Sequence, residues 1–127
     1  MNRVVHFEIQ TEDPARTQAF YENAFGWKFE QAMSKDQGGM DYWTIITGEG
    51  PGINGGMYVR PGDTKLYTYD CTIAVADLDK TIESIELNGG KITRPKGEIK
   101  GIGLFAGGVD TEGNRFGLLQ PTDWQPK

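Results

Sequence analysis

The chain has 127 residues, a net charge of −5, one cysteine and 18 glycines. This length predicts one domain with a substantial core, and the acidic charge without a basic run excludes nucleic acid and anionic membranes as expected partners. One cysteine cannot form an internal disulfide, and no apolar run suits a secretory signal or a membrane helix, so a cytoplasmic location is expected.

The first predicted unit is a strand followed directly by a helix. Apolar and polar side chains alternate over residues 4–11, which predicts a strand with one face on a core. Asp13 is placed to cap the following helix, Pro14 suits its first position, and Gly26 ends it. The polar face of the strand carries His6, Glu8 and Gln10.

Three further strands are predicted before the middle of the chain. Residues 27–32, 41–47 and 53–60 have the aromatic and β-branched composition or the turn-bounded pattern of strands. The polar loop 33–40 separates the first two of them. This first module therefore has the order βαβββ, and residues 61–65 form its boundary.

Residues 69–90 are a degenerate copy of the first strand and helix. Asp77 and Gly90 take the places of the cap and the terminating glycine, and Asp70 takes the place of His6. Alternation puts Cys71 among the apolar side chains and Thr72 beside Asp70 on the opposite face. Strands are predicted at 91–94, 101–109 and 115–120, with a loop at 95–100, so the βαβββ order is repeated.

The predicted fold class is α+β. Two βαβββ modules, about residues 1–60 and 66–121, form a curved eight-stranded mixed sheet, or cup, with the helices outside. The whole chain, 1–127, is one domain, and residues 122–127 are a C-terminal tail. A ligand is expected on the concave face of the cup.

Three blocks of the sequence carry a resemblance to a known family. They are residues 6–27, residues 71–92 and the closing stretch GIGLFAGGVDTEGNRFGLLQP, in which Thr111 replaces the proline of the usual turn. Together they resemble the vicinal oxygen chelate (VOC) superfamily, which includes glyoxalase I, bleomycin-resistance proteins and extradiol dioxygenases. The resemblance implies a metal-ligand position on the first and last strand of each module in metal-dependent members.

In this chain the four implied metal-ligand positions are His6, Asp70, a position within Asn54–Gly56 taken as Gly56, and Gly117. Only His6 and Asp70 carry strong donors, whereas a catalytic metal usually needs about three protein ligands. No cofactor is therefore expected, and a divalent metal is the alternative. Without a metal, His6 and Asp70 could act as a general base and its orienting carboxylate.

The other candidates are ligand-binding side chains: Glu8, Trp43, Tyr58, Thr72, Phe105 and Trp124. Aromatic rings and a few polar groups suit a small, partly apolar or aromatic molecule. The favoured hypothesis is a bleomycin-resistance-like binding protein without a tightly bound metal. The alternatives are a metal-dependent lyase, isomerase or dioxygenase-like enzyme using His6 and Asp70, and a regulatory or scaffolding role. Catalysis stays open, and a homodimer is expected because sheet edges are left open.

Overall fold

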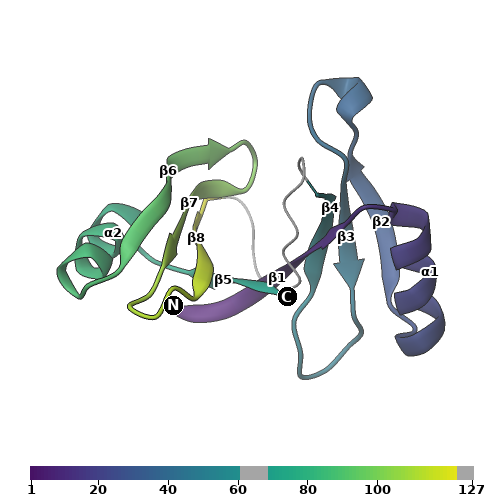
Figure 1. Ribbon diagram of the computed structural model, residues 1–127, viewed down its shortest axis with the longest axis horizontal. Coiled ribbons are helices and arrows are strands. Elements are labelled where there is room, and N and C mark those ends of the chain that lie inside the picture. Colours follow the sequence, from purple (N-terminus) through teal and green to yellow (C-terminus); the bar gives the residue numbers. More distant parts are fainter. Residues whose placement is uncertain (61–68, 123–127) are drawn as a thin grey trace. The chain divides into compact units, whose positions relative to one another are not determined.

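The computed structural model describes residues 1–60 and 69–122, and Figure 1 shows its helices and strands. The elements in chain order are β1 (Arg3–Thr11), α1 (Pro14–Phe25), β2 (Lys28–Met33), the 3-10 turn η1 (Lys35–Gln37), β3 (Tyr42–Ile46), β4 (Gly55–Val59), β5 (Asp70–Ala74), α2 (Leu78–Leu87), β6 (Lys91–Ile99), β7 (Gly103–Val109) and β8 (Arg115–Pro121). No helix among these residues is long and apolar enough to cross a membrane.

The chain forms two compact units, which we call the first module (His6–Tyr69) and the second module (Met1–Val5 with Asp70–Lys127). In the first, the strand order is β2-β3-β4-β1, with β4 antiparallel to β3 and parallel to β1. In the second, the order β6-β7-β8-β5 repeats this pattern, with β8 antiparallel to β7 and parallel to β5. The predicted α+β class with two βαβββ modules is confirmed.

The acids that follow β1 and β5 begin the two helices as predicted. Asp13 accepts a hydrogen bond from the backbone N–H of Arg16 at 3.1 Å, and Asp77 accepts one from Lys80 at the same distance. Gly26 ends α1 in the left-handed conformation, with φ 74°. The predicted end of α2 at Gly90 is wrong, because the helix already stops at Leu87, where the side chain of Asn88 donates to the Ser84 carbonyl at 2.7 Å.

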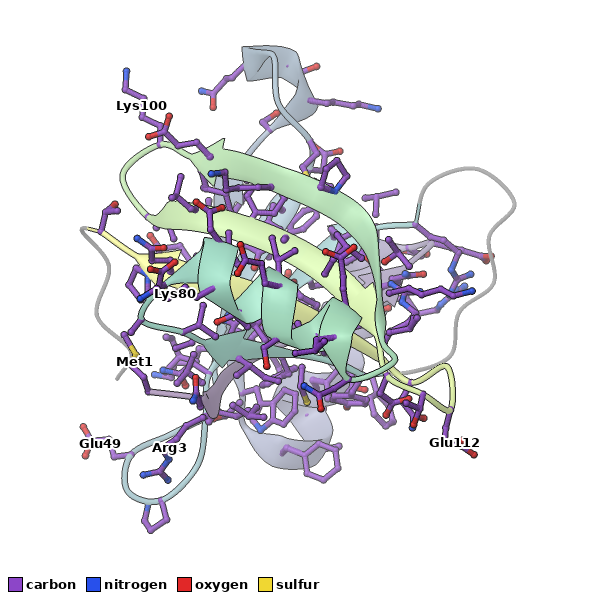
Figure 2. The ribbon with its side chains drawn as sticks, turned by 90° about the vertical axis from the view of Figure 1, so that its left-hand side faces the viewer. Met1, Arg3, Glu49, Lys80, Lys100 and Glu112 are labelled. Atoms are coloured by element: carbon purple, nitrogen blue, oxygen red, sulfur yellow. The ribbon has the colours of Figure 1, made fainter. Side chains whose placement is uncertain are left out.

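Each helix covers the apolar face of the sheet in its own module. In the first module the core consists of Phe7, Ile9, Ile45 and Met57, with Tyr21 of α1 packed against it. In the second it consists of Val75, Leu78, Ala106 and Leu118, and Ile82 and Ile85 of α2 pack there. Figure 2 shows α2 lying across the strands of this sheet, with Lys80 labelled. The opposite faces therefore carry the polar side chains of β1 and β5.

Two features of the second module differ from the predictions. The expected loop 95–100 is largely strand, because β6 continues to Ile99. Proline is tolerated there since β6 is the outer strand of its module's sheet and its register shifts between Arg94 and Gly97. The second difference concerns Cys71, which alternation placed among the apolar side chains. It is only half-buried, because it lies at the beginning of β5.

Candidate functional site

The polar face of the first module brings together side chains from three adjacent strands. Phe7 and Ile9 of β1 point into the core, so His6, Glu8 and Gln10 lie on the other face. The strand register places Glu8 opposite Gly56 of β4, and it places Gln10 opposite Tyr58, which in turn lies opposite Tyr42 of β3. We call His6, Glu8, Gln10, Tyr42, Gly56 and Tyr58 the polar face.

Three of these side chains form a hydrogen-bonded network. The Tyr42 hydroxyl donates to Glu8 Oε1 at 2.9 Å. His6 Nε2 lies 3.1 Å from the same carboxylate oxygen and 3.2 Å from the Tyr42 hydroxyl oxygen. Burial, and then the neighbouring Glu8 carboxylate, raise the pKa of Tyr42 far above its ordinary value. Tyr42 therefore remains a protonated hydroxyl that can donate a hydrogen bond.

Gly56 provides the space that Tyr42 fills. A Cβ atom at Gly56 would overlap the hydroxyl oxygen and the ring of Tyr42, and it would lie 2.9 Å from Glu8 Oε2. Gly56 is also the position of an implied metal ligand. A phenol hydroxyl consequently lies where the side chain of such a ligand would begin.

A second hydrogen bond on this face joins Gln10 to Tyr58. Gln10 Nε2 donates to the Tyr58 hydroxyl oxygen at 2.7 Å. Two acceptor oxygens beside these bonds, Glu8 Oε2 and Gln10 Oε1, are buried and have no hydrogen-bond partner among the described residues. The polar face thus combines two tyrosine hydroxyls with two unsatisfied acceptors.

The corresponding face of the second module is organised by an ion pair. Asp70 Oδ2 accepts a hydrogen bond from Arg115 Nη2 at 2.7 Å. Thr72 lies opposite Gly117, just as Glu8 lies opposite Gly56, so the repeat makes the two glycines equivalent. Sequence reasoning missed Arg115, although the parallel pairing of β5 with β8 would have placed it beside Asp70.

The aromatic candidates have different outcomes. Tyr58 lies on the polar face, and Phe105 has the Arg94 guanidinium carbon 4.6 Å from its ring centroid. Trp43 was predicted to bind the ligand, but its side chain packs against the core of the first module. Its neighbour Tyr42 lies on the polar face instead. Alternation leaves only one of the two on each face, and the large apolar ring takes the buried one. Trp124 lies outside the described residues.

The residues of the implied metal positions do not fit a catalytic metal. Gly56 and Gly117 offer no side-chain donor, and the Asp70 carboxylate is engaged by Arg115. Within residues 1–60 and 69–122, no three His, Cys, Asp or Glu side chains are grouped closely enough to hold a metal ion. His6 and Asp70 belong to different modules, so their action as a pair stays a prediction.

One open groove of about 610 Å³ lies elsewhere, on the helix side of the second module. Its lining includes Ile73, Val75, Lys80, Ile85 and Phe116, and it contains none of the predicted site residues. This groove is open and mostly apolar, whereas the acid–base and hydrogen-bonding groups are on the polar face. The chemistry therefore favours the polar face as the candidate site.

Comparisons with known proteins agree with this fold. A family model described as bleomycin resistance protein-like N-terminal matches residues 3–40. Lactoylglutathione lyase GLX1 of Arabidopsis thaliana is 28% identical over 126 residues, which cover 93% of this chain and 44% of that protein. The chain thus spans less than half the length of the curated relatives it matches.

Solved structures with low sequence identity share the fold. Methylmalonyl-CoA epimerase from Mycobacterium tuberculosis superimposes with a TM-score of 0.68 at 14% identity, covering 94% of this chain and 87% of that one. The hypothetical protein BH1468 from Bacillus halodurans superimposes with a TM-score of 0.72 at 11% identity, covering 98% of each chain. At these identities the likeness concerns the fold alone.

Proposed function

We propose that the chain is a member of the VOC superfamily, and that it binds a small, partly apolar organic molecule on the polar face of the first module, without a tightly bound catalytic metal. The observation that carries the proposal is the position of Tyr42. Its hydroxyl lies over Gly56, hydrogen-bonded to Glu8, where a metal-dependent relative would need a ligand side chain. Two tyrosine rings and several polar groups on one face suit such a guest.

A second candidate function is acid–base catalysis on a small oxygenated substrate. The network of His6, Glu8 and Tyr42 favours it, because one group can accept a proton while a neighbouring hydroxyl donates a hydrogen bond to a developing oxyanion. The similar proteins include a lyase and an epimerase by name. Turnover of a bound ligand would distinguish this candidate from simple binding. Homodimerisation and a cytoplasmic location stay predictions.

The proposed site can be located by nuclear magnetic resonance with a library of small aromatic fragments. We expect bound fragments to shift the amide resonances of β1, β3 and β4. His6→Ala should weaken binding by about tenfold, because Glu8 and Tyr42 lose the imidazole that helps to hold them in place. Glu49→Gln, in an exposed loop of the same module, is the control and should change nothing.

Shifts confined to the residues that line the groove beside α2 would contradict the proposal. The same holds if His6→Ala retains its fold and binds every fragment as well as the parent. Either result would move ligand binding away from the polar face.

A further inference from the structure

The polar face contains acceptors that the described residues leave without donors. Glu8 Oε2 and Gln10 Oε1 are buried and unpartnered, and both side chains project from the same face of β1. A buried acceptor without a donor is destabilising, so an unsatisfied pair in one site points to a missing partner. The hydrogen bonds to Tyr42 and Tyr58 use Glu8 Oε1 and Gln10 Nε2. Glu8 Oε2 and Gln10 Oε1 can therefore each accept a hydrogen bond from a ligand.

The missing partner must donate hydrogen bonds. A carboxylate and an amide oxygen only accept, and the carboxylate prefers a charged donor because charge-assisted hydrogen bonds are the stronger ones. Arg60, which directly follows β4, is ion-paired with Glu12 at 2.6 Å, and His6 contacts the other oxygen of Glu8. A ligand that brings its own cation therefore complements this face.

Tyr42 covers the approach to Glu8. Its hydroxyl and Glu8 Oε2 both lie over the backbone of Gly56, where no side chain competes for space. If the Tyr42 ring turns away from Gly56, its hydrogen bond to Glu8 Oε1 is broken and Glu8 Oε2 becomes accessible to a ligand. An incoming ammonium group has three N–H donors, enough to replace the hydroxyl and to satisfy the second oxygen.

We propose that the polar face of the first module binds a protonated amine, with Tyr42 turning away from Gly56 so that the ammonium group contacts the Glu8 carboxylate and Gln10 Oε1. This inference rests on the proposed function and specifies the chemical class of its ligand. The rings of Tyr42 and Tyr58 supply apolar contact for the remainder of the molecule. An alcohol of the same shape brings one uncharged donor and a carboxylate brings none, so neither can satisfy both acceptors.

Three probes with one ring and different charge test the proposal: benzylamine, benzyl alcohol and benzoate, titrated at pH 7 into the full chain. The readout is the amide resonances of Glu8 and Tyr58. Benzylamine should bind with a Kd at least about tenfold lower than that of benzyl alcohol, and benzoate should bind more weakly still. If either competitor binds this face as tightly as the amine, the inference fails and the proposed function stands. If no probe binds the face, both fail.

Two carboxylate variants distinguish a direct contact between the amine and Glu8 from a general attraction of a cation to an acidic protein. Glu8→Gln should remove the preference for the amine, whereas Glu12→Gln, which makes the same charge change at the residue that follows β1, should retain it. Tyr42→Phe removes the phenol hydroxyl that donates to Glu8, so it should bind benzylamine several-fold more tightly. Equal losses in the two carboxylate variants, or weaker binding in Tyr42→Phe, would overturn the proposal. The Tyr42 variant decides the question even if Glu8→Gln fails to fold.

Discussion

Gly56→Ala is expected to destabilise the protein by about 1–3 kcal/mol, the usual range for overpacking a filled site. The new methyl group would overlap the Tyr42 hydroxyl and ring, so the ring must leave its position. Its hydrogen bond to Glu8 and its contact with His6 are then lost. Chemical denaturation of parent and variant measures the difference in the free energy of unfolding.

Two second-site variants test the cause of this effect. Tyr42→Ala removes the ring, so adding it to Gly56→Ala should recover most of the overpacking penalty. Tyr42→Phe should not, because the ring carbon that carries the hydroxyl still overlaps the added methyl group. If Gly56→Ala is as stable as the parent, or if both tyrosine variants rescue it equally, Tyr42 does not fill this space.

Leu78→Ala is expected to destabilise the second module by about 2–5 kcal/mol, the range for truncating a fully buried leucine. Leu78 opens α2 and has an exposed fraction of 0%, and it packs with Val75, Ala106 and Leu118. Deleting its side chain leaves a cavity among strands that cannot close around it. Thermal or chemical unfolding gives the change in stability.

Leu87, at the other end of the same helix, provides the matched control. It is 87% exposed, so Leu87→Ala removes the same atoms with almost no loss of burial. Its free energy of unfolding should stay within about 0.5 kcal/mol of the parent. If the two leucine variants lose similar amounts of unfolding free energy, the packing of Leu78 is not what holds α2 against its sheet.

Local rules were sufficient to predict most of the fold. The acids Asp13 and Asp77 mark both helix starts because a capping carboxylate is a local interaction, and alternation placed His6 and Glu8 on one face. Two boundaries were predicted wrongly, for different reasons. The strand β6 passes through Pro95 because an outer strand tolerates it, and α2 stops at Leu87 because Asn88 closes it.

The candidate site was harder to predict because its key features depend on strand register. Sequence alone could not choose between Tyr42 and Trp43, since adjacent residues on a strand differ only in the face they occupy. The sequence left the implied metal-ligand position of the first module anywhere within Asn54–Gly56. The strand register assigns it to Gly56, because Gly56 lies opposite Glu8 just as Gly117 lies opposite Thr72.

Equivalent glycines in the two modules nevertheless have different surroundings. Gly56 is covered by Tyr42, whereas the three atoms nearest to a Cβ atom at Gly117 all belong to Thr72, and the closest, Oγ1, would make a tight contact at 3.1 Å. A side chain at Gly117 therefore requires a small adjustment, and one at Gly56 requires a ring to move. This difference makes Gly117 the better position for restoring a metal ligand.

The most direct test of the account is the metal content of the parent protein, purified without chelator and dialysed. The donor set predicts well under one equivalent of zinc, iron, nickel or manganese, because two strong ligands rarely retain such ions against water and buffer. Gly117→Glu, measured in parallel, should bind more zinc than the parent. About one equivalent of divalent metal retained by the parent would contradict the claim that the polar face works without a tightly bound catalytic metal.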